Sequence, residues 1–255
     1  MKAMIFAAGL GTRLKPLTDT IPKALVPLAG KPLLQWQVEK LRDAGITDII
    51  VNVHHFPDMI IDTIRRNNGW GCHITVSDER DQLLDTGGGL RKAVHRTLYT
   101  VHPTPILACN VDILSNIDIR ALVDRYDSLN SLTSRSGSPS LLVVSDRPTQ
   151  RYLCFDEQDT LCGWTNIATG ELKGRDGRHL AFSGMQILSS DALSLLEQMQ
   201  EEKFSLIDFY LRVMNDVPLH AFVPTDYRMM DVGKIDQIEQ AEKFAEQINR
   251  SNKMR

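Results

Sequence analysis

The sequence predicts an α/β fold, a three-layer α/β/α sandwich with a mixed, mostly parallel central sheet, and three features lead to it. Through the first half of the chain, short apolar runs that suit buried strands alternate with segments of helical periodicity. The second half carries short strand-like segments separated by turns, which indicates an antiparallel extension. The length of 255 residues suits one α/β domain over 1–255, with halves at 1–130 and 131–255.

The first half opens with an apolar run at 4–8, ended by Gly9, where we expect a buried strand. Leu34, Val38 and Leu41 then recur at helical spacing before a glycine stop at Gly45. The next expected elements are a strand at 49–53, a helix at 60–66, a strand at 73–76, a helix that begins after Gly89, and a strand at 106–109.

The second half begins with a serine-rich segment, 131–139, which predicts a loop. Ser205 suits the N-cap of a helix running to Asn215, and we expect the chain to fray after Asn249. Short strands are expected at 141–145, 151–155, 160–164 and 180–188. An apolar stripe marks the last helix: Ile238, Ala241, Ala245 and Ile248.

Composition and charge exclude several classes of protein. A net charge of -3 and a pI near 6.2 argue against a non-specific nucleic-acid binder, so any anion site is local. No apolar run reaches the length of a signal peptide or a membrane span, so we expect a cytoplasmic protein with no membrane partner.

Cysteines and histidines form no metal-binding motif in the sequence. The cysteines lack a CxxC pair, so neither a zinc site nor a disulfide framework is indicated: Cys72, Cys109, Cys154 and Cys162. His54 and His55 are adjacent, and neighbours on a strand point to opposite faces, so we assign them to loop structure.

The segment Gly9-Leu10-Gly11-Thr12-Arg13 suits a phosphate-binding loop at the end of the first strand. Its glycines allow a sharp turn and a close approach to a ligand, while Arg13, Lys15 and Lys23 supply positive charge. A dinucleotide fingerprint needs a third glycine where Leu14 stands, and the P-loop pattern is absent. An ordinary strand-to-helix turn is the competing interpretation, and the basic cluster favours a triphosphate.

Two aspartates are candidate ligands for Mg²⁺. Asp112 follows the strand at 106–109, where a carboxylate would face the ligand crevice, and Asp231 precedes Gly233 near the last helix. Each could instead cap a turn or a helix. Sequence spacing alone does not bring the two together.

Three consecutive glycines follow Asp85-Thr86 and indicate a place where another group comes close to the backbone. At a helix N-terminus their amides could contact a nucleobase or a phosphate, and a flexible turn is the alternative. Lys23 follows Pro22 and is preorganised to steady a charged transition state, whereas Lys31 is expected to be a solvated surface charge.

Taken together, these residues resemble the sugar-1-phosphate nucleotidyltransferase family. The resemblance is specific over 4–18 and 22–33, and weaker matches to the family's motifs occur at Asp112, 182–184 and 231–233. It implies the fold of nucleotide-diphospho-sugar transferases, with a nucleotide-binding first half and a sugar-binding second half. It also implies Mg²⁺-dependent attack of a sugar 1-phosphate on the α-phosphorus of a nucleoside triphosphate, with release of pyrophosphate.

The resemblance assigns roles to individual residues. Catalytic roles would fall to Arg13, Lys23 and Asp112, and Mg²⁺ would be held by Asp112 and Asp231. Nucleotide-binding residues would be Ala8, Gly9, Gly11, Thr12, Arg13, Lys23, Thr86, Gly87 and Gly88, and sugar-binding residues Asn110, Gly184 and Asp208.

The substrate pair is left open by the sequence. The Asp85–Gly89 segment looks most like the branch with N-acetylmuramate-1-phosphate uridylyltransferases, which implies UTP and an amino-sugar 1-phosphate. GTP with a mannose or heptose 1-phosphate is the alternative. Many members place glycine where this chain has Val111, so a nucleotide-sugar-binding regulator without turnover is a third interpretation.

Overall fold

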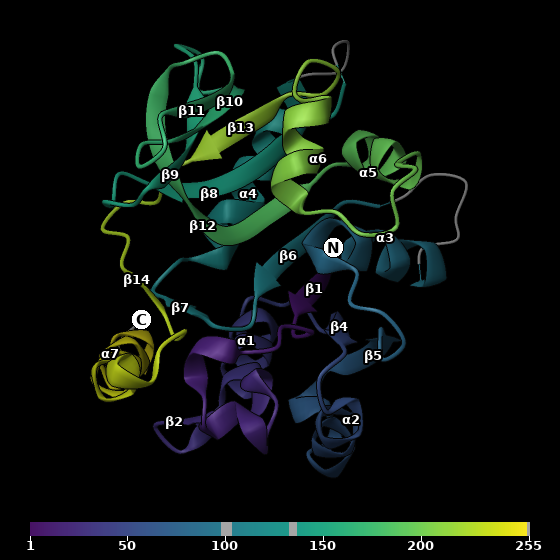
Figure 1. Ribbon diagram of the computed structural model, residues 1–255, viewed down its shortest axis with the longest axis vertical. Coiled ribbons are helices and arrows are strands. Elements are labelled where there is room, and N and C mark those ends of the chain that lie inside the picture. The colour runs from purple at the N-terminus through teal and green to yellow at the C-terminus, as the bar shows by residue number, and fades with distance from the viewer. Residues whose placement is uncertain (98–103, 133–136, 254–255) are drawn as a thin grey trace. The chain divides into compact units, whose positions relative to one another are not determined.

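The computed structural model describes residues 1–97, 104–132 and 137–253, which form two compact units (Figure 1). We name each after one of its strands: the β1 unit (2–83, 109–117 and 228–255) and the β12 unit (1, 84–108 and 118–227). Both units combine segments that are far apart in the sequence. The expected halves at 1–130 and 131–255 stay a prediction.

The β1 unit contains a parallel sheet of β1 (Lys2–Phe6), β4 (Asp48–Val53) and β5 (His73–Asp78). Residues 3–5 of β1 are fully buried, as expected for a strand in a parallel sheet. The expected strand at 4–8 is displaced towards the N-terminus. Its ladder ends at Phe6 because the Ala7 N–H donates to the Asn52 side chain instead of to a strand.

Two helices connect these strands, and both were expected. α1 (Leu33–Asp43) buries its stripe of leucine and valine, and Gly45 with φ 90° follows its end. α2 (Pro57–Arg66) begins earlier than expected because proline suits the first turn of a helix. The periodicity and the glycine stop therefore located α1, and the helix expected at 60–66 falls within α2.

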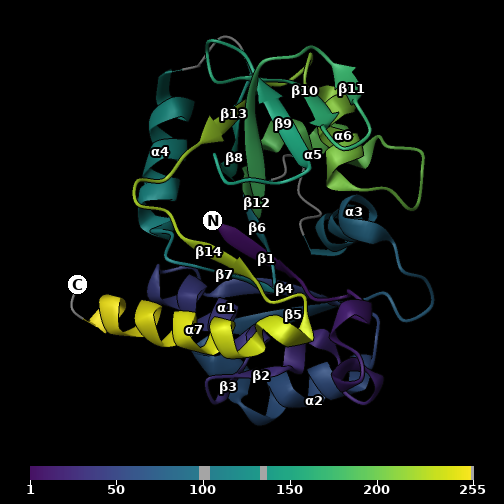
Figure 2. The same cartoon turned by 60° about the vertical axis from the view of Figure 1, so that its left-hand side comes forward.

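Short strands and the last helix complete the β1 unit. α7 (Ile238–Lys253) contacts β2 (Pro27–Leu28) and β7 (Ile113–Ser115), as Figure 2 shows. Its Ala241 and Ala245 are fully buried, so the expected apolar stripe is confirmed. The helix continues to Lys253, so the expected fraying after Asn249 is wrong over 250–253, and 254–255 lie outside the described residues. The remaining strands are β3 (Lys31–Pro32) and β14 (Met229–Asp231).

The β12 unit is built on antiparallel pairs, which confirms the expected extension. β12 (Arg178–Leu188) pairs with β8 (Ser140–Ser145) and β9 (Arg151–Phe155), while β10 (Leu161–Asn166) pairs with β9 and with β11 (Glu171–Gly174). β13 (Leu219–Phe222) runs parallel to β8. β11 was not foreseen because all of its residues are exposed and it lacks apolar alternation.

Helices of the β12 unit include two that were not expected, α4 (Ile119–Leu132) and α5 (Ser190–Glu197). α4 takes the start of the expected loop, whose residues 133–136 lie outside the described chain. α3 (Asp85–Thr97) contacts α5 and α6 (Leu206–Val213) (Figure 1). Ser205 caps α6 as expected, although the helix ends at Val213.

β6 (Ile106–Asn110) runs from the β12 unit into the β1 unit. The predicted α/β class is confirmed, since parallel strands joined by helices occur together with antiparallel hairpins. Over the described residues, none of the helices is both long and apolar enough to cross a bilayer.

Candidate active site

The glycine loop follows β1, and its two glycines have different structural reasons. Gly11 has φ 63°, and a Cβ there would lie 2.8 Å from Thr18 Cγ2 and 3.0 Å from Lys23 Cβ. Thr18 Oγ1 donates to the Gly11 carbonyl over 2.8 Å, which closes the turn. Gly9 has no atom within 4 Å of its would-be Cβ and no left-handed φ, so the fold does not require glycine there. Open space at Gly9 is what a ligand approaching the backbone would need.

A buried polar network holds the peptide that leads into the loop. Asn52 Oδ1 accepts from Ala7 N over 2.7 Å, and Asn52 Nδ2 donates to Glu79 Oε1 over 2.8 Å. Both Asn52 and Glu79 are buried. Sequence reasoning missed these positioning residues, although an asparagine inside the apolar run 49–53 was a usable signal.

Lys23 and Asp112 form an ion pair in the β1 unit. Lys23 Nζ donates to Asp112 Oδ2, and the two side chains are only 10% and 18% exposed. Lys23 opens a 3₁₀ turn directly after Pro22, while Asp112 lies in the turn between β6 and β7. The pair is therefore sheltered from solvent at both ends.

Asp231 is brought to Asp112 by backbone pairing. β14 runs antiparallel to β7, with Asp231 opposite Ile113, and Val232 N donates to the Asp112 carbonyl over 2.8 Å. Asp231 therefore belongs to a strand and does not cap the following helix. The structure thus joins the two candidate metal ligands that sequence spacing could not connect.

The surroundings of Asp231 disfavour its negative charge. Burial raises the pKa of Asp231, and the nearby Asp112 carboxylate raises it further, against the opposing effect of Lys23 and Arg13. Arg13 Nη2 lies 3.6 Å from Asp231 Oδ2. Asp231 Oδ1 is buried and has no hydrogen-bond partner within the described residues. An orphaned oxygen beside a second carboxylate fits the hard oxygen ligands that Mg²⁺ prefers.

Gly233 leaves room for the Asp231 carboxylate and the Arg13 guanidinium. A Cβ at Gly233 would lie 2.6 Å from Asp231 Oδ1 and 2.8 Å from Arg13 Nη2. Val111, the departure from the family pattern, is only 4% exposed, and its N–H donates to the Phe6 carbonyl. Its side-chain bulk therefore lies in the core.

The triple glycine lies within α3, which begins at Asp85, so the expected helix start after Gly89 is wrong. Gly87 N and Gly88 N donate to the Phe204 carbonyl, and a Cβ at Gly87 would lie 2.4 Å from the Phe204 ring. Thr86 Oγ1 accepts from Leu206 N over 2.9 Å. Packing against the segment before α6 explains Gly87 and Gly88, and contact of these residues with a nucleobase stays a prediction.

Other predicted residues have these positions. Gly184, with φ 70°, lies where β12 changes register against β8, and Asn110 ends β6. Asp208 Oδ2 accepts from Ser205 Oγ over 2.7 Å at the start of α6. Asn110 belongs to the β1 unit, with the loop and the aspartates, whereas Gly184, Asp208 and the triple glycine belong to the β12 unit.

Two predictions about surface residues have different outcomes. His54 Nδ1 lies 2.8 Å from the Glu79 carbonyl and His55 Nε2 3.1 Å from that of Thr18, so their assignment to loop structure is confirmed. Lys31 is not a solvated charge, because it is half-buried, pairs with Glu39 over 2.5 Å and lies over the Trp36 ring. It lines a pocket of about 320 Å³ beside α1 and α7 that none of the predicted site residues reaches.

Comparisons with known proteins find sugar-1-phosphate nucleotidyltransferases among the relatives of this chain. An N-acetylmuramate alpha-1-phosphate uridylyltransferase from Neisseria meningitidis is 40% identical over 51% of this chain and 54% of its own length. A mannose-1-phosphate guanyltransferase from Debaryomyces hansenii is 32% identical over 63% of this chain and 42% of its own. The chain thus spans about half the length of the curated relatives it matches.

A solved structure and a family model extend the likeness to nearly the whole chain. The crystal structure of HddC from Yersinia pseudotuberculosis superimposes with a TM-score of 0.71 and 25% identity, covering 95% of this chain and 99% of that one. The model of the nucleotidyl transferase family matches residues 2–248. The chain belongs to the nucleotidyl transferase family.

Proposed function

We propose that this protein transfers a nucleotidyl group from a nucleoside triphosphate to a sugar 1-phosphate and releases pyrophosphate. The observation that carries the proposal is the convergence of two cations and two carboxylates beside a glycine loop: Arg13, Lys23, Asp112 and Asp231. An oxygen of the sugar phosphate forms the new bond to the α-phosphorus, and the bond to the pyrophosphate group breaks. Positioning and charge neutralisation supply most of the catalysis in such a transfer.

The loop residues bind the triphosphate in this proposal. Open space at Gly9 lets phosphate oxygens approach the backbone from Ala8 to Thr12. Gly11 allows the tight turn of the loop, because a side chain there would clash with Thr18. The Arg13 side chain is 59% exposed, so a triphosphate in solution can reach its charge. A planar guanidinium pairs well with phosphate oxygens.

Asp112 and Asp231 hold Mg²⁺ in this proposal, since the donor set is all oxygen and Asp231 Oδ1 has no other partner within the described chain. Bound Mg²⁺ supplies positive charge that offsets the charge of the reacting phosphates. With Asp112 as a ligand of the cation, the ammonium group of Lys23, which pairs with Asp112 here, would contact the same phosphates.

UTP and N-acetylmuramate 1-phosphate, or a similar amino-sugar 1-phosphate, are the substrates we propose. The support is the uridylyltransferase relative, which is 40% identical over half of this chain. The guanyltransferase relative, aligned over 63% of the chain, favours GTP with mannose 1-phosphate or a heptose 1-phosphate as the second candidate. We assign base contacts to Thr86, Gly87 and Gly88, and sugar contacts to Asn110, Gly184 and Asp208.

A turnover panel tests the proposal. Purified protein is mixed with Mg²⁺, with UTP or GTP, and with N-acetylmuramate, N-acetylglucosamine, mannose or heptose 1-phosphate, and pyrophosphate release is measured. We expect release only with both substrates, highest with UTP and an amino sugar, and a nucleotide sugar of matching mass. Asp112→Asn is the control for a contaminating enzyme.

The same panel separates the enzyme from a regulator without turnover. Nucleotide-sugar binding with no pyrophosphate release, and with affinity unchanged in Asp112→Asn, would overturn the proposal in favour of the regulator. We place the protein in the cytoplasm, because its four cysteines are free thiols.

A further inference from the structure

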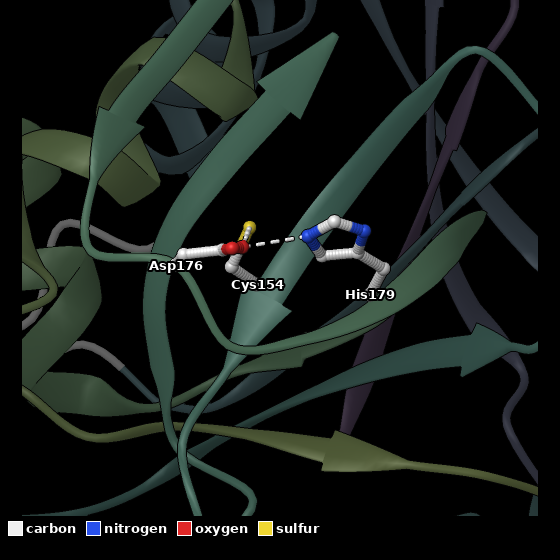
Figure 3. A group of neighbouring side chains, drawn as sticks. All are labelled: Cys154, Asp176 and His179. Carbon is white, nitrogen blue, oxygen red and sulfur yellow. Dashed lines mark hydrogen bonds and ion pairs between the residues drawn. The ribbon is translucent and has the colours of Figure 1, made fainter. Parts of the chain in front are cut away.

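Cys154, Asp176 and His179 form a compact group in the β12 unit, apart from the residues used above (Figure 3). Cys154 lies on β9 directly opposite His179 on β12, so their side chains leave the sheet on the same face. Asp176 comes from the turn that joins β11 to β12. One ligand atom from each residue lies within 4.8 Å of the others.

Two proton donors of this group converge on one carboxylate oxygen. His179 Nε2 lies 2.7 Å from Asp176 Oδ1, and Cys154 Sγ lies 3.9 Å from the same oxygen (Figure 3). Gly177 N also donates to Asp176 Oδ1, which fixes the carboxylate on the turn. Side chains held this way need only small shifts to surround one cation in place of the shared protons.

The surroundings hold the group in place while leaving it open to solvent. Cys154 is fully buried and forms the floor, whereas the His179 and Asp176 side chains are 38% and 68% exposed. The His179 ring stacks on Tyr152, with centroids 5.6 Å apart, which limits its rotation. Cys162 Sγ donates to the Cys154 carbonyl over 3.4 Å. His179 and Asp176 are therefore open to an ion in solution, and Cys154 Sγ lies within 4.8 Å of their ligand atoms.

We propose that Cys154, Asp176 and His179 bind one Zn²⁺ ion. Sulfur and imidazole ligands favour Zn²⁺ over Mg²⁺, and three protein ligands leave the fourth tetrahedral position to water. On binding, the thiol proton passes to solvent and the imidazole proton moves to Nδ1. One thiolate and one carboxylate then balance the charge of the ion, so the half-buried centre is neutral.

Cysteine spacing in the sequence indicated no zinc site, and the register of β9 against β12 explains why. The three ligands come from two segments that no local motif joins. The site is distinct from Asp112 and Asp231, which offer only oxygen donors and belong to the β1 unit.

Metal content and a cobalt spectrum test this proposal without measuring turnover. The full chain is stripped with a chelator, loaded with Zn²⁺ or Co²⁺ in the presence of excess Mg²⁺, desalted and analysed. We expect one Zn²⁺ per chain and a thiolate-to-Co²⁺ charge-transfer band. Both should be lost in Cys154→Ser and His179→Gln, and both should persist in Cys72→Ser, which removes a thiol of the β1 unit.

Each outcome decides the matter. His179 is partly exposed, so His179→Gln is expected to fold even where Cys154→Ser does not, and circular dichroism of the metal-free variants checks this. Wild-type protein that retains no Zn²⁺, or retention that is unchanged in His179→Gln, would overturn the site. Asp112→Asn should keep its Zn²⁺ while losing pyrophosphate release, which separates this proposal from the proposed transferase function.

Discussion

Replacing Gly233 by alanine tests whether Asp231 is a working metal ligand. The new Cβ would lie 2.6 Å from Asp231 Oδ1, against about 3.4 Å for an ordinary contact, so the carboxylate must move by about 0.8 Å. A misplacement of about 1 Å in a reacting group costs on the order of 100-fold in rate. We therefore expect kcat to fall roughly 10- to 100-fold.

Stability should hardly change in Gly233→Ala. The atoms that the Cβ would meet are the ends of two side chains that are 59% and 45% exposed, and the backbone of Gly233 has no left-handed φ. Alanine also reduces the conformational entropy of the unfolded chain. We expect the free energy of unfolding to change by less than about 1 kcal/mol.

Initial rates of pyrophosphate release at several Mg²⁺ concentrations, together with urea denaturation, measure both quantities. Ile64→Val is the control, because it removes a buried methyl group from α2, an element that carries none of the four charged side chains, at a cost of about 1 kcal/mol. Its kcat should equal that of the wild type. If Gly233→Ala kept wild-type kcat and Mg²⁺ dependence, Asp231 would not be a metal ligand in the reaction.

Gly9→Ala adds a methyl group to open space, so the free energy of unfolding should change by less than about 0.5 kcal/mol. The methyl group would occupy the space proposed for the phosphates, so the Kd for the nucleotide, measured by calorimetry, should rise about tenfold or more. An unchanged Kd would contradict the loop proposal. Asp112→Asn leaves the sheltered Lys23 without its carboxylate, and urea denaturation should show a loss of about 2 to 4 kcal/mol; wild-type stability would mean that the pair contributes little. Burial lowers the pKa of Lys40 to about 7 in the folded protein, whereas its pKa in the unfolded chain is about 10.4. Between about pH 7 and pH 10.4 the unfolded chain therefore binds more protons than the folded protein, so the free energy of unfolding rises with pH. Lys40→Met should remove up to about 1.4 kcal/mol per pH unit of this rise. The hydrogen bonds that Lys40 donates to Ser115 favour the charged form and reduce this figure. Equal slopes of the free energy of unfolding against pH, between pH 8 and 10, in wild type and variant would refute this prediction.

Elements with a local signal were predictable. The stripe of α1 and its glycine stop, the Ser205 cap of α6 and the alanines of α7 each express a physical preference of nearby residues. α4 also carries such a signal, since Ile119, Leu122 and Tyr126 are spaced for one helical face and are buried, and it was overlooked. β11 has no local signal, because its strand state comes from pairing with β10.

The candidate site was predictable in its chemistry and not in its assembly. Glycines, basic residues and aspartates of the right types were visible along the chain, and they indicated phosphate and metal binding. The triple glycine indicated a ligand contact or a flexible turn, and Gly87 and Gly88 lie against the segment around Phe204, so a ligand contact there stays a prediction. A glycine indicates that some group lies close to its backbone, and that group can be a ligand or another segment of the chain.

By itself, the sequence determined the α/β class, the loop after the first strand and the residue types that can bind a triphosphate and Mg²⁺. Only the tertiary structure decided which of these residues meet. Asp231 reaches Asp112 through the β7 and β14 ladder, and His179 faces Cys154 through the register of β12 on β9. Backbone hydrogen bonds between distant segments set both encounters, and a local sequence does not specify the partner of its own N–H and C=O groups.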